Sequence, residues 1–164
     1  YLNQTAALAD YADHWNDTEP TSSLITLGTD SSVNGSGAPN IIYAFTEKTG
    51  YSKFGSYKGN GNADGAFIYT GFQPAWLIIK KTSTVGSWYM YDNKRPGYNT
   101  TQANSDALLA DGTDSEFNSN IDLVSNGFKI RTSGSGENQS GESFIYMAFG
   151  QSLVGSNNIP CTAR

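Results

Sequence analysis

Short apolar runs separated by clusters of Gly, Ser, Asn and Asp make up most of the chain from residue 50 onward. The run at 75–81 is apolar at almost every position, as expected for a central strand that is buried on both faces. Strands are predicted at 51–58, 66–70, 75–81, 88–91, 121–123, 128–132 and 144–149. Short strands at such close spacing predict an all-β fold, an antiparallel β-sandwich with little helix.

The remaining segments have a mixed pattern. Ala, Leu and Asp in TAALADYADHWND (5–17) are spaced for one or two helical turns, which Pro20 ends. Two strands are predicted after it, at 24–27 and 41–45, joined by a long polar connection. A short helical turn is also expected within DALLADGTDSEFN (106–118).

Two stretches of the chain have similar sequences. When residues 24–45 are moved along by 104 positions (24 onto 128), they align with residues 128–149 without a gap. The second copy has the same loop length and the same strand ending, so we interpret the match as an internal repeat. The identical pairs are Ser31/Ser135, Asn34/Asn138, Ser36/Ser140, Gly37/Gly141, Ile41/Ile145, Ala44/Ala148 and Phe45/Phe149.

The repeat divides the chain into three parts. Residues 1–49 are interpreted as the C-terminal half of a preceding repeat, 50–150 as a complete sandwich module and 151–164 as a C-terminal tail. A fragment of about 45 residues buries too little surface to fold alone and leaves strand edges unpaired. We therefore expect the half-module to pack on, or exchange strands with, a neighbour: the complete module, another copy of the chain, or upstream residues.

Composition and net charge limit the classes of partner that are expected. The chain has 18 Gly, 13% aromatic and only 15% charged residues, and its net charge is −5. A field of that sign repels phosphate groups, so nucleic acid and membrane insertion are not expected. No apolar run reaches the roughly 20 residues that span a bilayer. Cys161 is the only cysteine, which excludes an internal disulfide and, with one histidine, a zinc site.

Several blocks of residues 50–164 occur in the order found in one family of modules. They are GYSKFGSYKGNGNADGAFIYTGFQPAWLIIKKT, WYMYDNKR, NIDLVSNGFKIR, FIYMAFGQ and NNIPCTAR. Together they resemble a module of virion structural proteins of marine tailed phages, often repeated near the C-terminus of tail-fibre-like proteins. FGQS stands here where relatives commonly have an acidic residue. The resemblance implies a jelly-roll or concanavalin-like, laminin-G-like β-sandwich.

The resemblance also implies a function. It leads us to expect a phage virion structural protein, an exposed tail-fibre or appendage module on the particle surface. Its expected partners are other copies of itself, other virion proteins and host-surface glycans. Two alternatives stay open: a capsid-decorating or filament-forming subunit without a ligand, and a virion-associated polysaccharide-degrading enzyme.

The residues that could act in catalysis or bind a metal give little support to the enzyme alternative. His14 is the only histidine, and a solitary histidine beside Trp15 is more often a surface or packing residue than a base. Acidic residues occur at 92–122, where two of them could form a glycosidase pair, or Asp111, Asp114 and Glu116 could hold a calcium ion. Acidic residues spread through turns are more often plain turn formers. We predict no catalytic residue, no metal and no cofactor.

Aromatic residues beside polar loops are the remaining candidates. Phe67, Trp76 and Phe149 lie in apolar strands and are predicted to be core residues. The loop YDNKRPGYN (91–99) instead combines rings with polar groups that could hold a sugar, because a ring face packs on C–H groups. Its alternative is an ordinary exposed loop in which Arg95 pairs with an acid. The candidate ligand-binding residues are Tyr91, Asp92, Asn93, Arg95, Tyr98 and Asn99.

Overall fold

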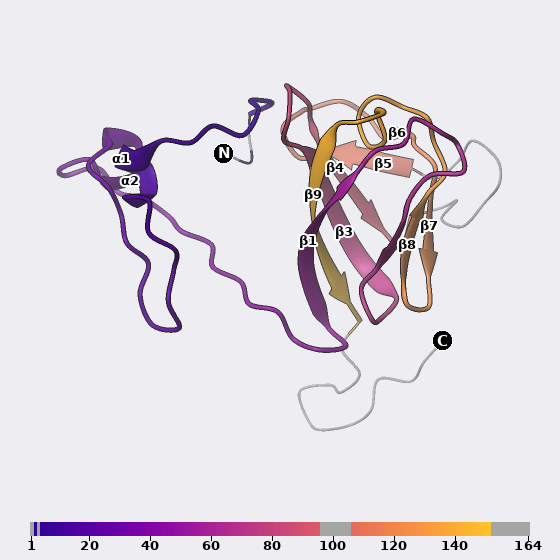
Figure 1. The fold of residues 1–164 in the computed structure, drawn as a ribbon, viewed down its shortest axis with the longest axis horizontal. Coiled ribbons are helices and arrows are strands. Elements are labelled where there is room, and N and C mark those ends of the chain that lie inside the picture. Colours follow the sequence, from indigo (N-terminus) through magenta and orange to yellow (C-terminus); the bar gives the residue numbers. More distant parts are fainter. Residues whose placement is uncertain (1, 3, 96–105, 152–164) are drawn as a thin grey trace. The chain divides into compact units, whose positions relative to one another are not determined.

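Two antiparallel sheets dominate the computed structural model, which describes residues 2, 4–95 and 106–151 (Figure 1). A six-stranded sheet has the order β1-β9-β3-β4-β5-β6, and a three-stranded sheet has the order β2-β8-β7. The strands are β1 (Ser52–Lys58), β2 (Phe67–Tyr69), β3 (Pro74–Lys81), β4 (Trp88–Asp92), β5 (Asp106–Leu109), β6 (Phe117–Asn118), β7 (Ile121–Val124), β8 (Gly127–Ile130) and β9 (Ser143–Gly150). The predicted all-β sandwich with little helix is confirmed.

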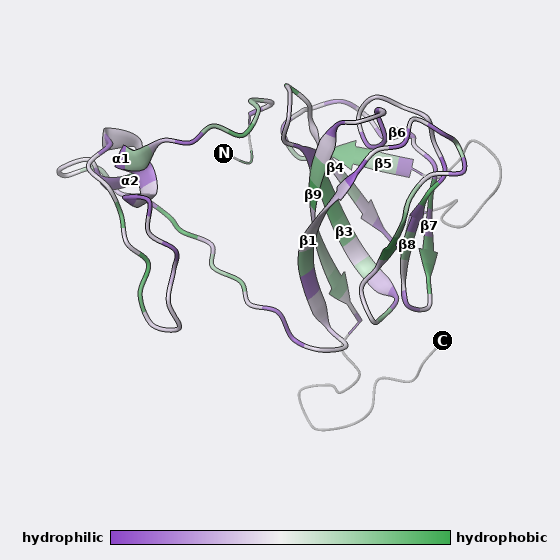
Figure 2. Ribbon diagram, viewed as in Figure 1, coloured by the Kyte–Doolittle hydropathy of each residue, from purple (hydrophilic) through white to green (hydrophobic). Residues whose placement is uncertain are grey.

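The hydrophobic core lies between the inner faces of the two sheets. On the small sheet, Ile68, Leu123 and Phe128 alternate with outward-pointing residues and are buried. The large sheet contributes Leu77 and Phe144, and both are fully buried. Hydrophobic residues are concentrated on the strands of both sheets in Figure 2. Period-two alternation therefore puts one face of each sheet into a common core.

Strand β3 is buried on both faces. It lies between β9 and β4, and Leu77 and Ile79 point into the core. Ile78 points away from the core and is nevertheless buried. Side chains on both faces of β3 are therefore buried, in agreement with the apolar run at 75–79.

Residues 8–45 form a compact unit separate from the sandwich. Two short helices occur in it, α1 (Ala12–Trp15) and α2 (Ser31–Asn34), and α1 is the helical turn predicted in the first 20 residues. The predicted strands at 24–27 and 41–45 are wrong, because neither segment is a strand in this structure. A strand needs a neighbour to bond its backbone N–H and C=O groups, and these two segments pair with no strand in the described residues.

The prediction for 106–118 is also wrong. This segment contains β5 and β6 instead of a helical turn. Tyr89 and Met90 of β4 pair with Leu109 and Leu108, and Ala107 is fully buried. Pairing with β4 outweighs the weak helical preference of Ala and Leu.

Phe128→Ala should destabilise the sandwich by about 3–5 kcal/mol, because it removes a fully buried ring from the core between the sheets. Tyr69→Ala, on the outer face of the same small sheet, should change stability by no more than about 0.5 kcal/mol. Urea unfolding followed by tryptophan fluorescence measures both. Equal losses for the two variants would contradict the assignment of inner and outer faces.

Candidate functional site

The predicted binding loop begins with a residue that is inside the protein. Tyr91, in β4, is buried, and its hydroxyl donates to Glu137 Oε1 at 2.8 Å and lies 2.9 Å from Ser119 Oγ. A buried ring has no free face on which a sugar can stack. Tyr91 is therefore removed from the candidate ligand contacts, and its role is structural.

The next residues of that loop are tied to each other. Asp92 Oδ1 accepts hydrogen bonds from the Lys94 and Arg95 amides, and Arg95 Nε lies 2.7 Å from Asp92 Oδ2. Burial opposes ionisation of Asp92, but the hydrogen bonds from Arg95 and the two amides outweigh it and lower the pKa of Asp92. Arg95 Nη1 also bonds Glu116. Arg95 thus pairs with acids, as the alternative reading of the loop expects.

The other predicted ligand contacts lie apart from this ion cluster or outside the described residues. The Asn93 amide donates to the Ala75 carbonyl at 3.0 Å, which joins the end of β4 to β3. Tyr98 and Asn99 lie outside the described residues. The structure therefore brings together Asp92 and Arg95, with Glu116, a candidate calcium ligand in the sequence, as a third member.

A buried carboxyl group joins three parts of the sandwich. Glu137, in the β8–β9 loop, accepts hydrogen bonds from Tyr91 and Ser119, and its carbonyl accepts one from the Tyr57 hydroxyl at 2.7 Å. Burial raises the pKa of Glu137 above the ordinary glutamate value, although these hydroxyl donors act in the opposite direction. The arrangement connects β1, β4 and the residue after β6 to one loop.

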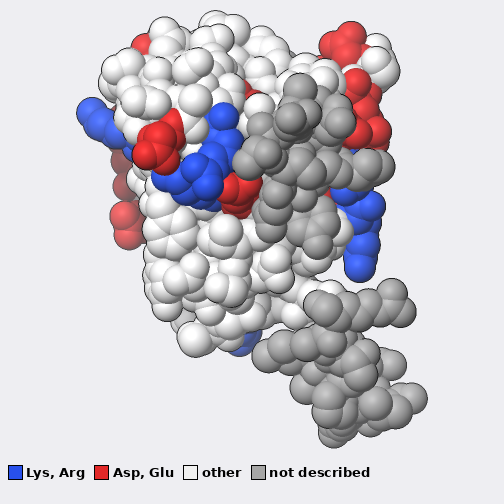
Figure 3. Space-filling model, turned by 90° about the vertical axis from the view of Figure 1, so that its right-hand side faces the viewer, with Lys and Arg blue, Asp and Glu red and all other residues white. Residues whose placement is uncertain are grey.

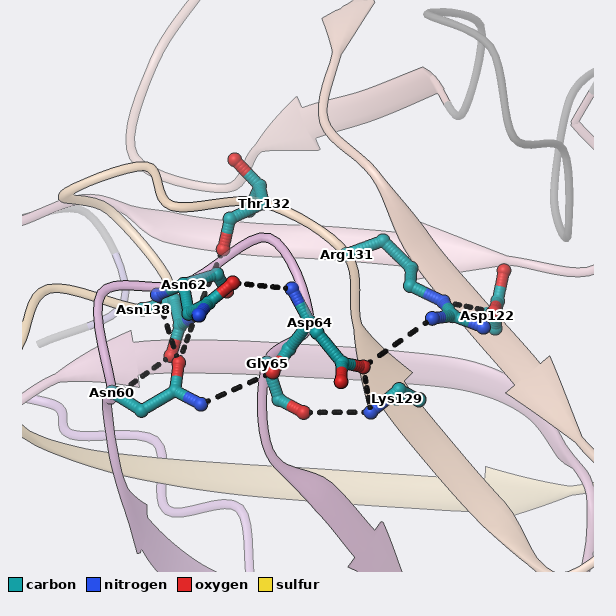
Figure 4. A network of polar contacts seen from close by, with 9 residues as sticks. All are labelled: Asn60, Asn62, Asp64, Gly65, Asp122, Lys129, Arg131, Thr132 and Asn138. Atoms are coloured by element: carbon teal, nitrogen blue, oxygen red, sulfur yellow. Dashed lines mark hydrogen bonds and ion pairs between the residues drawn. The ribbon is translucent and has the colours of Figure 1, made fainter.

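The neighbouring residue holds a second loop. Asn138 is fully buried, and its Oδ1 accepts from the Asn60 amide at 2.9 Å. Its Nδ2 donates to Asn60 Oδ1, the Asn62 carbonyl and the Thr132 carbonyl. Figure 4 shows these contacts converging on one side chain. The β1–β2 loop (59–66) and the β8–β9 loop (131–142) are thereby fixed to each other.

Paired charges lie on the outer face of the small sheet, beside that loop. Lys129 Nζ is 2.8 Å from Asp64 Oδ1 and donates to the Gly65 carbonyl at 2.9 Å. Arg131 bonds Asp122 and lies 3.6 Å from Asp64 (Figure 4). The hydrogen bond from Lys129 lowers the pKa of Asp64. Two acids and two bases therefore form one polar row.

Two exposed aromatic rings continue the same face. Phe67 pairs with Lys129, Tyr69 pairs with Gly127, and the two rings are 48% and 65% exposed. A Cβ atom at position 127 would lie 2.1 Å from the Ile68 carbonyl oxygen, so only glycine fits at this position of β8. Figure 3 shows charges of both signs meeting in the upper half of one side of the molecule, above a broad area with almost no charge.

The prediction that Phe67 is a core residue is wrong. In AFIYT the inward residue is Ile68, so Phe67 and Tyr69 must share the opposite face. This alternation was visible in the sequence and could have identified the pair. Trp76 and Phe149 are half-buried, with their rings 5.7 Å apart.

The remaining candidates have structural partners. His14 Nε2 lies 3.6 Å from Asp30 Oδ1, and Asp111 Oδ1 accepts the Trp88 amide at 2.7 Å. Cys161 lies outside the described residues. Within 2, 4–95 and 106–151, no three His, Cys, Asp or Glu side chains are grouped as a metal site. Over the same ranges, no helix has the length and apolar character to cross a bilayer.

Asn138→Ala should cost at least about 3 kcal/mol of stability, because several backbone and amide groups lose their partner inside the protein. Asn40→Ala is the matched control, since Asn40 is exposed and its side chain donates to the nearby Ala38 carbonyl. The control should lie within about 0.5 kcal/mol of the unmodified chain. Denaturant titration measures both, and a loss below about 1 kcal/mol for Asn138→Ala would contradict the anchoring role.

Glu137→Gln should become more stable relative to the unmodified chain as the pH rises. A raised pKa in the folded state gives stability that is present below the ordinary value of 4.5 and is lost as the pH rises through the folded value. Each unit of raised pKa corresponds to about 1.4 kcal/mol. Unfolding of both proteins at pH 4, 6 and 8 measures the difference.

Glu47→Gln provides a control of opposite sign. The hydrogen bond from Lys53 lowers the pKa of Glu47, so its contribution is present above 4.5 and is lost as the pH falls. This variant should therefore lose stability relative to the unmodified chain as the pH rises. The same trend in both variants would contradict the role given to burial of Glu137.

Comparison with curated proteins and with solved structures yields no match. One family model does match, and it covers residues 1–152, so it includes both the 8–45 unit and the sandwich. On that match, the chain belongs to the family described as Domain of unknown function (DUF7483).

Proposed function

We propose that the chain is a non-enzymatic structural module of a tailed-phage particle, of the tail-fibre type, which binds carbohydrate on the host surface. The resemblance to marine phage modules supports the first part, and the blocks that carry it include β1–β4 and β7–β9. The outer face of the small sheet supports the second part. The proposal assigns no catalytic residue.

The observation that carries glycan binding is the pair of exposed rings beside fixed polar groups. Phe67 and Tyr69 are two residues apart on one strand, so both rings are on the same face. Aromatic faces pack against the C–H groups of a sugar ring, while charged and amide groups bond its hydroxyls. Lys129 on β8, Asp122 on β7 and Arg131, which follows β8, supply such groups.

The polar groups are already held in position. Asp64 and Asp122 are each paired with a base, so a ligand meets oriented donors and acceptors instead of mobile side chains. The row has no net charge, and the whole chain carries −5. This balance favours an uncharged sugar chain over an acidic one, because the overall field repels anions.

Tyr69→Ala and Phe67→Ala should each weaken glycan binding about tenfold or more, since an aromatic contact worth about 1.4 kcal/mol changes the affinity by that factor. A glycan array of neutral and acidic host polysaccharides identifies a ligand, and titration calorimetry measures the variants. Tyr43→Ala is the control, because Tyr43 is 70% exposed and belongs to the separate 8–45 unit.

Three outcomes would decide against parts of the proposal. Absence of binding to any host glycan would remove the adhesin role and leave an architectural subunit. Release of reducing ends from host polysaccharide would restore the enzyme alternative. Labelled antibodies that decorate the capsid wall of the particle, instead of its tail or appendages, would replace the tail-fibre location with capsid decoration.

A further inference from the structure

The repeat found in the sequence is also a repeat of conformation. Asn34 Nδ2 donates to the Gly28 carbonyl at 2.9 Å, six residues earlier. Asn138 Nδ2 donates to the Thr132 carbonyl at 2.8 Å, again six residues earlier. When 28–38 is aligned with 132–142 by the shift of 104 positions (34 onto 138), the donor residues of these two hydrogen bonds align, and so do their acceptor residues. The loop at 28–38 is thus a second copy of the loop at 132–142.

Backbone contacts extend the match along both loops. The Asn34 amide donates to Asp30 and the Asn138 amide donates to Gly134, at aligned positions. The Ala38 amide bonds the Gly35 carbonyl, as the aligned Glu142 amide bonds Gln139. Gly37 and Gly141 align as well, and their φ angles are 72° and 79°. These values lie in the left-handed region, where glycine is favoured.

The two loops differ in what covers them. The β1–β2 loop lies on the loop at 132–142: the Asn60 amide donates to Asn138 Oδ1, and the Gly61 amide donates to the Asn138 carbonyl at 2.7 Å. The Gly59 amide bonds the Glu142 carbonyl. Asn138 is fully buried as a result, whereas Asn34, with the same local hydrogen bonds, is exposed.

The segments on either side of the two loops also differ in burial. Ala148 and Tyr146, in β9, are buried, but the aligned Ala44 and Ile42 are exposed. Leu24 is exposed, whereas the aligned Phe128 is fully buried. Residues 24–45 therefore carry the apolar positions of β8 and β9 without the strands that cover them.

Within the sandwich at 46–151, the positions that residues 24–45 would fill are already occupied. Its β9 already lies between β1 and β3, its β8 lies between β2 and β7, and its β1–β2 loop is bound to Asn138. A second intact copy of the chain offers the same occupied positions. The partner that fits is a module that has strands β1–β7 and an Asn-x-Asn loop but lacks its own β8 and β9.

We propose that residues 24–45 complete a second sandwich of this family by supplying its last two strands and its asparagine loop. Asn34 then binds the β1–β2 loop of the partner module as Asn138 binds Asn60 and Asn62. In that complex 41–45 and 24–27 become strands, because the partner supplies the missing backbone neighbours. The inference does not rest on glycan binding.

The experiment uses the intact chain and a defined probe, a fluorescently labelled copy of residues 46–126, which ends before β8. We expect a complex of one chain and one probe in native mass spectrometry, and a titratable anisotropy change. Asn34→Ala and Ile42→Asp in the intact chain should each weaken binding at least about tenfold. Thr29→Ala, at an exposed position that aligns with the exposed Ser133, should leave the affinity within about twofold.

A double-mutant cycle tests the contact directly. Asn60→Ala in the probe should weaken binding to the unmodified chain and add little to the effect of Asn34→Ala, since both remove one contact. No complex, after mixing or after co-production of chain and probe, would overturn the proposal, as would equal binding by the Asn34→Ala chain. Self-association of the intact chain that Asn34→Ala abolishes would overturn the assigned partner and point to a second copy.

Discussion

A β-strand persists only where neighbouring strands bond its backbone N–H and C=O groups. This constraint explains why two similar stretches, FIYMAF and IIYAF, have different structures in one chain. The first is β9, between β1 and β3, and its alternate side chains are buried. The second pairs with no strand in the described residues and exposes Ile41, Ile42 and Tyr43. Side-chain pattern sets the preference for a strand, and the neighbours decide whether the strand forms.

The β8–β9 loop shows how buried polar groups can organise a sandwich. Glu137 and Asn138 are adjacent, and both are buried with hydrogen bonds to several elements. Glu137 faces β1 and β4, whereas Asn138 faces the β1–β2 loop. Because an unpaired buried polar group costs free energy, these bonds favour one loop conformation over the alternatives. That conformation recurs at 28–38 without the covering loop, so local hydrogen bonds and the glycine at 37 are sufficient to form it.

Surface chemistry follows the strand register. The row of Asp64, Lys129, Arg131 and Asp122 is assembled from one loop, two neighbouring strands and the residue that follows β8. The loop after β4 also has charged residues, but there Arg95 is paired with Asp92 and Glu116. A face with two exposed rings and a neutral polar row suits carbohydrate better than the paired ions of that loop do.

Periodicity in the sequence was enough to predict the all-β fold, seven of the strands in the sandwich and the burial of β3 on both faces, because alternation and turn residues act locally. The same rule, applied to AFIYT, places Phe67 and Tyr69 outside. Tertiary structure alone decided that 106–118 forms β5 and β6, that Tyr91 turns inward to Glu137, and that Arg95 meets Glu116. Each of these depends on groups far apart along the chain, whose proximity no local pattern records. The two loops with matching hydrogen bonds at Asn34 and Asn138 show the division most clearly: local residues determined these hydrogen bonds, and only long-range contacts determined which asparagine is buried.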